Sequence, residues 1–553
     1  MKKLLLKFWP ILICLIFAAL VAWPLALPGY FSHHDDLQVM RIFEMRKCLL
    51  DLQIPCRWVP DMGYGNGYPL FNYYAVLPYY IGAILSFLLG FLISAKLLFA
   101  IPIFLGAVAM YLLAKELFGI YPGIVASALF TYTPYRALDL YVRGDVAESF
   151  AIAIIPLVFY FVLKLTKLND SKYLVGLSLS LAIFLTSHNI MTVLFMPVLL
   201  LIIVYWQVIE KKRNLLKLIF GLFLGIGLAT FFILPAYFEK NLVQIDNLIR
   251  LDLNFRAHFV TVNQLFFSRF WGYGASVLGP NDTISFQVGW PHWWIAGLAV
   301  LVFFIHLKSR HKIKDSLPMV ITIIFLFSIF MTHTKAAFIW EQIDILKFAQ
   351  FPWRFLALSA FCASLLGGYL VQNLKGNRYI TIALIIITIV LNWSYFRPKE
   401  FYFNLTDQQK LSGEFWNDQR RAAILDYLPK TALEPTAPAS SSPIIKSGTA
   451  SIENFQSKSN SWQFQTEVTD NTVIEVPVFD FPKWEVKING QQAGFTKISD
   501  AGRIEIYIPK SGKYFILGRF ANTPIRLYSN IISLLSLVLL IGLSLYGKSK
   551  KYV

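Results

Sequence analysis

Long apolar runs recur along this 553-residue chain, and short charged segments separate them. Each run is close to the ~20 residues that a helix needs to cross the hydrocarbon core of a bilayer. Only 15% of the residues are charged and 56% are hydrophobic, whereas about a quarter of the residues in a typical soluble domain are charged. The pattern predicts a polytopic α-helical membrane protein.

The formal net charge of +18 would suit a nucleic-acid partner, but its distribution indicates a different cause. The excess lies in short clusters between apolar runs: KLTKLNDSK, EKKRNLLK, HLKSRHKIK, LKGNR and the terminal GKSKKYV. Cytoplasmic loops of membrane proteins carry such an excess of Lys and Arg. We therefore expect no nucleic-acid partner, an integral plasma-membrane protein surrounded by membrane lipids, and both termini on the cytoplasmic side.

Placing every basic cluster on the cytoplasmic side yields about twelve transmembrane helices. The first run, Phe8–Leu27, lacks a small-residue cleavage site, so we expect it to be retained. The stretch 70–113 is too long for one helix, and we assign it one crossing, Ala95–Leu113, after a re-entrant or surface-lying segment. The other predicted crossings are Ile120–Tyr135, Ser149–Leu165, Tyr173–Ser187, Ile190–Ile209, Leu216–Tyr237, Trp290–His306, Leu317–Met331, Pro352–Leu370, Tyr379–Trp393 and Ile531–Leu545.

The composition changes at residues 397–525, where polar and apolar residues alternate in short runs broken by Gly, Asn, Asp and Pro. The dipeptide Asn489–Gly490 is typical of a two-residue β-hairpin loop. This segment predicts an extracytoplasmic β-sandwich-like domain. It follows a transmembrane domain, residues 1–396, whose first outward loop spans 29–94, and it precedes the last helix and basic tail, residues 526–553.

Two of the four cysteines, Cys48 and Cys56, share the first outward loop. A loop outside the cell lies in an oxidising compartment, where a disulfide is stable. The sequence alone leaves open whether these two cysteines pair.

Ionisable residues concentrate in the loops assigned to the outer side. A charge inside a helical bundle costs at least ~2.5–3.5 kcal/mol, so such residues are functional candidates. Two alternatives stay open: solvation at the membrane boundary and, for the Asp pair, capping of the following helix. The candidates, which are ionisable residues together with the amides Asn189 and Gln350, are His33, His34, Asp35, Asp36 and Arg41 in the first loop, Arg136, Asp139, Arg143, Asp145 and Glu148 in the second, His188 and Asn189 in the third, and Lys347, Gln350 and Arg354 in the fifth.

These loops carry a resemblance to GT-C-fold glycosyltransferases, membrane enzymes that take a sugar from a polyprenyl-phosphate carrier. The spacing from Asp35 to Arg41 resembles the D-P-x-x-x-x-R start of the first loop in oligosaccharyltransferase catalytic subunits, and YVRGDVAESFAIA resembles their second loop. More closely, SHHDDLQVMRI, GYGNGYPLFNYY, YVRGDVAESFA and QFPWRFL resemble a GT-C-like group labelled 6-pyruvoyl-tetrahydropterin synthase-related. The stretch FDFPKWEVKINGQ, followed by GRIEIYIPKSGKYFI and a helix, resembles the end of YfhO-type membrane proteins.

The resemblance implies a glycosyltransferase that moves a sugar to a glycan, lipid or protein acceptor in the cell envelope. Asp35 would be the general base, with Asp36 orienting it or binding an acceptor hydroxyl. Trp58 and the aromatics of 68–74 would line the sugar and lipid paths. Residues that would bind the donor phosphate or sugar are Arg41, Arg136, Arg143, Asp145, Glu148, His188, Asn189 and Arg354.

The need for a metal stays open at this stage. If the enzyme uses Mg²⁺ or Mn²⁺, the ligands would be Asp35, Asp145 and Glu148, because oxygen ligands suit these ions. Two non-catalytic alternatives also stay open: a transporter or flippase for lipid-linked sugars, and a scaffold whose β domain binds polysaccharide.

Cysteine labelling tests the predicted orientation. With a membrane-impermeant maleimide applied to intact cells, cysteines introduced at Asp282 and Ser440 should react, whereas one at His311 should react only after permeabilisation. Labelling at position 311 without labelling at 440 would invert the orientation and move every candidate residue to the cytoplasmic side.

Overall fold

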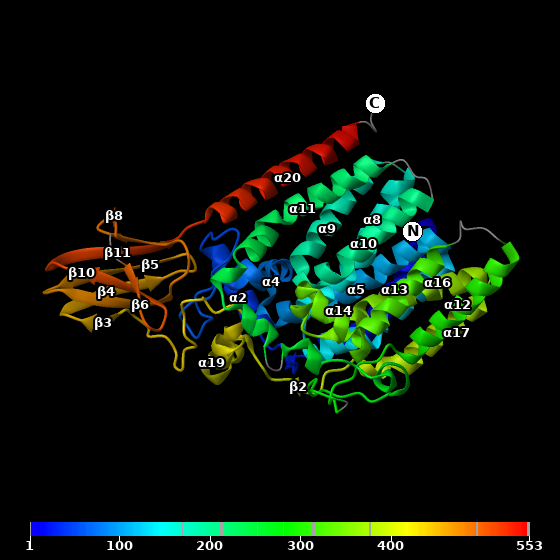
Figure 1. The fold of residues 1–553 in the computed structure, drawn as a ribbon, viewed down its shortest axis with the longest axis horizontal. Coiled ribbons are helices and arrows are strands. Elements are labelled where there is room, and N and C mark those ends of the chain that lie inside the picture. The colour runs from blue at the N-terminus through cyan, green and yellow to red at the C-terminus, as the bar shows by residue number, and fades with distance from the viewer. Residues whose placement is uncertain are drawn as a thin grey trace.

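The computed structural model describes residues 2–549, apart from 169, 210–213, 251–252, 280, 311–315, 375–377 and 494–495. It consists of a bundle of apolar helices and a β domain that projects from one end of the bundle (Figure 1). The last helix, α20 (Pro524–Ser549), runs back from the β domain along α11 (Leu215–Phe238). The prediction of a polytopic helical membrane protein with a C-terminal β domain is confirmed.

Each predicted crossing coincides with a helix of the bundle. Within the described residues, eight helices are long and apolar enough to span a membrane, or nine if α13 (Leu317–Thr332) and the segment Thr334–Gln342, bent by 95°, count as one span. The number of crossings therefore stays a prediction. The other bundle helices are α1 (Lys2–Ala22), α4 (Leu77–Leu89), α5 (Phe91–Phe118), α6 (Ile120–Thr131), α8 (Val146–Leu168), α9 (Ser171–Ser187), α10 (Asn189–Ile209), α12 (Trp290–Arg310), α13 (Leu317–Thr332), α16 (Leu356–Asn373) and α17 (Arg378–Asn392).

The stretch 70–113 forms two helices, the short α4 and the 28-residue α5, which meet at Gly90 with φ of +78°. The first turn of α5 is capped from far along the chain. The Asp407 carboxylate accepts hydrogen bonds from the backbone N–H groups of Phe91 and Leu92, at 2.7 and 2.9 Å. A carboxylate there satisfies N–H groups that have no partner within the helix, and it ties the segment before the β domain to the bundle.

The β domain consists of two antiparallel sheets with one shared core, to which Phe464, Ile474, Ile506 and Ile516 contribute. At Asn489–Gly490 both residues have positive φ, 51° and 84°, and β7 (Trp484–Ile488) pairs with β8 (Gln491–Gln492) across them, as predicted for this hairpin. One sheet has the order β3 (Ile444–Ser447), β6 (Thr472–Phe479), β10 (Arg503–Ile508), β9 (Thr496–Ile498); the other has β4 (Ala450–Ser457), β5 (Ser461–Val468), β11 (Gly512–Phe520), β7 (Trp484–Ile488), β8 (Gln491–Gln492).

The β domain is docked on the first loop, residues 29–94, which begins with β1 (Tyr30–Phe31) and α2 (Gln38–Leu50). Trp58 is 1% exposed and contacts the rings of Phe481, Trp484 and Phe520, with centroids 5.7 to 5.8 Å apart. The prediction that Trp58 lines a sugar path is therefore wrong, because its ring is buried against the β domain. Cys48 and Cys56 form a disulfide within the same loop.

Candidate active site

Backbone hydrogen bonds join the first loop to the second loop, which precedes α8. The N–H groups of His34 and Asp35 donate to the carbonyl oxygens of Val142 and Arg143, both at 2.9 Å. The side chain of Gln38 donates to the carbonyl oxygen of Gly144 at 2.8 Å. These bonds fix Asp35 directly beside the second loop.

The second loop contains a short π-helix, Leu138–Arg143, followed by Gly144 with φ of +72° and then α8. Single π-helical turns are rare and occur often at functional sites. Asp145 caps α8, because its Oδ1 accepts a hydrogen bond from the Glu148 N–H at 2.9 Å. Its other oxygen, Oδ2, faces a group of charged side chains.

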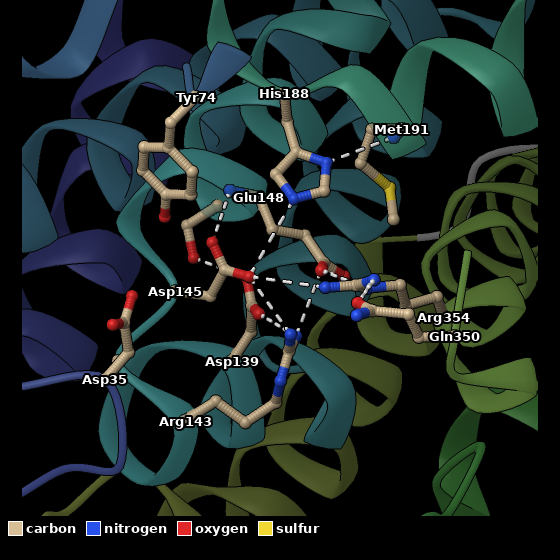
Figure 2. A network of polar contacts seen from close by, with 12 residues as sticks. Asp35, Tyr74, Asp139, Arg143, Asp145, Glu148, His188, Met191, Gln350 and Arg354 are labelled. Carbon is tan, nitrogen blue, oxygen red and sulfur yellow. Dashed lines mark hydrogen bonds and ion pairs between the residues drawn. The ribbon is translucent and has the colours of Figure 1, made fainter. Parts of the chain in front are cut away.

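Three carboxylates surround the guanidinium of Arg143 in this group (Figure 2). The Arg143 nitrogens lie 2.6 Å from Asp139, 3.0 Å from Asp145 and 3.1 Å from Glu148. Arg354, which lies just before α16, adds a second guanidinium, with Nε 3.0 Å from Glu148 and Nη2 3.8 Å from Asp145. All five side chains are buried. We call these five residues the ion cluster.

Secondary contacts hold the ion cluster in place. The Tyr135 hydroxyl donates a hydrogen bond to Glu148, and Ser149 donates one to Asp139 at 2.6 Å. The Arg143 guanidinium also lies over the Trp353 ring, 4.7 Å from its centroid. Buried charges are costly unless they are paired and hydrogen-bonded, and a buried charged group beside a cavity is a candidate functional site.

His188 approaches the ion cluster from the turn between α9 and α10. Its Nδ1 accepts a hydrogen bond from the Met191 N–H at 3.1 Å, and burial lowers its pKa below the ordinary value, so the ring is neutral. A neutral imidazole carries one proton, which must therefore be on Nε2. Nε2 lies 3.9 Å from Asp145 Oδ2, which is beyond hydrogen-bond distance.

The fit of a metal ion can be judged from these contacts. Ligand atoms of Asp145, Glu148 and His188 lie within 4.8 Å of one another. However, Nε2 of His188 holds a proton in place of the lone pair that a metal needs, and both carboxylates already contact guanidinium groups. The third predicted ligand, Asp35, binds Arg41 instead. In this structure guanidinium groups lie where a cation would contact these carboxylates, and the metal set Asp35, Asp145 and Glu148 stays a prediction.

A cavity of about 880 Å³ opens beside the ion cluster. Asp145, Arg143 and Arg354 form part of its wall, and Asp35 with Arg41 forms another part. Glu148 and Asp139 lie behind this wall and do not line the cavity. Its aromatic and apolar lining includes Tyr73, Tyr74, Tyr237, Leu248, Leu253, Ile345, Phe348, Phe351 and Trp353.

The two neighbouring carboxylates of the first loop point in different directions. Asp35 faces the cavity, and its Oδ2 lies 2.5 Å from Arg41 Nη1 and 3.2 Å from the Gln38 amide. The Leu37 N–H donates to the Asp35 carbonyl oxygen at 2.8 Å, and this turn before α2 lets the Asp35 side chain reach Arg41. Asp36 pairs with Lys410 at 2.6 Å and is not among the cavity-lining residues. Neither carboxylate caps α2, since among the described residues no side-chain hydrogen bond caps the N-terminus of this helix.

Arg136 and Asn189, both predicted to bind the donor, lie outside the ion cluster. Arg136 is buried and donates to the carbonyl oxygens of Pro102 and Phe130, so it lies outside the cavity lining where a phosphate would bind. Asn189 does line the cavity, and its amide donates to the Tyr73 carbonyl at 2.9 Å.

Sequence reasoning missed cavity residues that come from distant segments. Lys240 and His258 come from the long loop between α11 and α12, and Asp426 and Tyr427 precede the β domain. Their local sequence carries no motif, and Asp426 fell within the segment assigned to the β domain. Only the packing of that segment onto the first loop brings it to the cavity.

A family model described as "6-pyruvoyl-tetrahydropterin synthase related domain; membrane protein" matches residues 71–399, more than half of the chain. An uncharacterized protein of Lactococcus lactis subsp. cremoris is 23% identical over 248 residues, which is 42% of this chain and 40% of that protein.

The chain is also similar to solved structures at low identity. They include the mycobacterial arabinofuranosyltransferase AftD (12% identity, TM-score 0.49, covering 72% of this chain and 28% of AftD). The Archaeoglobus fulgidus oligosaccharyltransferase has 13% identity and a TM-score of 0.45, covering 78% of this chain and 61% of that protein. ArnT of Cupriavidus metallidurans bound to undecaprenyl phosphate has 13% identity and a TM-score of 0.31, covering 66% of this chain and 77% of ArnT. The chain spans less than two thirds of AftD, of the oligosaccharyltransferase and of the Lactococcus protein. Because all three TM-scores are below 0.5, they carry no weight in the functional argument.

Gly144 is expected to be essential for the junction between the two loops. A Cβ atom at this position would approach His33 Cδ2 to 1.9 Å, and the positive φ adds a cost of about 1–2 kcal/mol for any other residue. Gly144→Ala should therefore displace the loop segment that carries His33 and Asp35 and lower the melting temperature of the detergent-solubilised protein.

Gly413→Ala is the matched control, because Gly413 has φ of +59° but nothing lies within 4 Å of its Cβ position. Gly413→Ala should lower the melting temperature only by the cost of placing alanine at a positive φ, without a steric clash. Equal melting temperatures for the two variants would contradict the proposed role of Gly144 in joining the loops.

Proposed function

The chain belongs to the family of membrane proteins described as 6-pyruvoyl-tetrahydropterin synthase related, and from its site we propose that it is a glycosyltransferase. It moves a sugar from a polyprenyl-phosphate carrier to a hydroxyl of an envelope glycan, lipid or protein on the outer face of the plasma membrane. One observation carries the proposal: a single cavity holds a partly free carboxylate, Asp35, and a buried guanidinium cluster.

The reaction has two requirements on opposite sides of the sugar. The acceptor oxygen forms a bond to the anomeric carbon while the bond from that carbon to the phosphate oxygen breaks. The acceptor hydroxyl loses its proton to a base, and the phosphate leaves with the bonding electrons. The protein must therefore hold a hydroxyl on one side and stabilise an anionic phosphate on the other.

Asp35 suits the acceptor side. Arg41 and Gln38 hold its Oδ2, while no partner of its Oδ1 occurs among the described residues. A carboxylate fixed in this way accepts a hydrogen bond from a hydroxyl without losing its own orientation.

Arg354 and His188 suit the phosphate side. Nη2 of Arg354 and Nε2–H of His188 both lie near Asp145 Oδ2, at 3.8 and 3.9 Å, which is too far for strong hydrogen bonds. Donors that are buried but not fully used bind an incoming anion well, and a guanidinium group matches phosphate geometry. The apolar side chains Leu248, Leu253, Ile345 and Phe348 would contact the polyprenyl chain.

A transporter or scaffold for lipid-linked sugars would also use basic and aromatic residues, but it would need no carboxylate at the reacting carbon. The convergence of Asp35 on the same cavity as Arg354 favours catalysis over these alternatives.

We expect transfer without a divalent cation, because guanidinium groups take the place of the metal beside Asp145 and Glu148. Purified protein assayed with polyprenyl-phosphate sugars should keep its rate in EDTA. A loss of activity in EDTA that Mn²⁺ restores would contradict this expectation and assign the carboxylates a ligand role.

Asp35→Asn should lower the transfer rate by about 10²-fold or more, because an amide cannot act as a carboxylate toward the hydroxyl. Asn has the same size, so expression, melting temperature and binding of undecaprenyl phosphate should be unchanged. Mass spectrometry of envelope glycans from cells that lack the protein, complemented with each variant, would measure the product.

Asp36→Asn is the comparison variant, since Asp36 contacts Lys410 outside the cavity. If Asp36→Asn lost transfer while Asp35→Asn kept it, the roles of the two residues would be exchanged. Normal glycans in both variants would leave the transporter or scaffold as the better explanation.

A further inference from the structure

The segment before the β domain forms a wall of the cavity. It contains the 3₁₀ turn Ile424–Asp426, and Ala423, Asp426 and Tyr427 line the cavity together with Asp35 and Arg41. The segment that completes the site thus lies more than 380 residues along the chain from Asp35.

The wall is held against the first loop by specific contacts. The Tyr68 hydroxyl donates to the Ala423 carbonyl at 2.7 Å and accepts from the Tyr427 N–H at 2.6 Å. The Tyr73 ring stacks on Tyr427 with centroids 5.5 Å apart and an interplanar angle of 21°. These contacts place the Asp426 side chain at a defined position in the cavity wall.

Asp426 differs from the other carboxylates around the cavity. Asp35 pairs with Arg41, and Asp145 pairs with Arg143. In the part of the chain that the structure describes, no hydrogen bond or ion pair engages the Asp426 carboxylate. A carboxylate in such a position has both oxygens available for a ligand.

The surroundings of Asp426 also favour its protonated form. Burial raises the pKa of Asp426 to about 7, with a further contribution from the Asp35 carboxylate and an opposing one from Arg41. The other titratable groups that face it are the phenols of Tyr68 and Tyr427, which are neutral at this pH. A carboxylate of this kind changes protonation state near neutral pH, where a general base is most effective.

We propose that Asp426 is the catalytic base of the site and takes the proton of the acceptor hydroxyl, while Asp35 orients that hydroxyl. This inference rests on the proposed glycosyltransferase function. As the acceptor oxygen bonds to the anomeric carbon, its proton passes to an Asp426 oxygen, and the carrier phosphate leaves as an anion. Asp426 then returns the proton to water.

The assignment has a consequence for the acceptor. Asp35 of the first loop and Asp426 of the segment 423–427 both line the cavity, so the proposal places the acceptor hydroxyl between these two segments. The segment that leads into the β domain is then part of the active site, and the docked β domain holds it in position.

The test compares Asp426→Asn with Asp418→Asn in the full-length protein. Asp418 belongs to α19 (Gly413–Arg421) in the same segment, but it is exposed and does not line the cavity. In transfer assays with polyprenyl-phosphate sugars, Asp426→Asn should lower kcat by about 10²-fold or more, and Asp418→Asn should be normal. Wild-type activity should rise as the pH increases through about 7. Any residual activity of Asp426→Asn should not show this rise.

A second measurement needs no substrate. The pKa of Asp426 in the folded protein lies above the ~3.9 of an unfolded chain, so its contribution to stability is greatest at low pH and is lost as pH rises toward 7. The melting temperature of the wild type, compared with that of Asp426→Asn, should therefore fall between pH 5 and pH 8. Asp418→Asn should follow the wild type at every pH.

The outcomes separate the two proposals. A wild-type protein that transfers no sugar from any polyprenyl-phosphate donor would overturn the proposed function. An active wild type whose kcat and pH profile are matched by Asp426→Asn would overturn only the assignment of the base. A pH-independent difference in melting temperature would also count against Asp426 as the group that titrates near neutrality.

Discussion

The free-energy cost of burying the five charged side chains of the ion cluster is the constraint on which the rest of the site depends. Asp139, Asp145, Glu148, Arg143 and Arg354 are all buried. Removing one partner of such a group leaves an uncompensated charge, at a cost of several kcal/mol. The loops that supply these side chains can therefore adopt few arrangements other than the one in which the charges meet.

This constraint explains why the second loop has an unusual backbone. The π-helix 138–143 and Gly144, with its positive φ, turn the chain sharply before α8. The turn lets Asp145 cap α8 with one oxygen and face the cavity with the other. It also leaves carbonyl oxygens free to bind the backbone of the first loop, and in this way Asp35 is brought to the same cavity.

The β domain contributes to the site through its attachment and not through its sheets. The β domain packs on the first loop through Trp58, and the disulfide between Cys48 and Cys56 cross-links that loop. The segment that enters the domain forms part of the cavity wall, where Tyr68 and Tyr73 hold it. A domain fixed in this manner positions cavity residues more precisely than a mobile lid would.

The sequence by itself determined the class of protein, the positions of the helices and the existence of the β domain. Those features follow from local composition: apolar length, alternation of polar residues and the Asn489–Gly490 turn. Charged residues beside apolar runs also identified most of the candidate site, because the cost of burying charge can be inferred without a structure.

Only the tertiary structure decided which of these residues share a cavity. Asp35 and Asp36 are neighbours in sequence, yet one faces the cavity and the other faces Lys410. Asp426 joins the site through packing between segments hundreds of residues apart, and local sequence carries no record of such contacts.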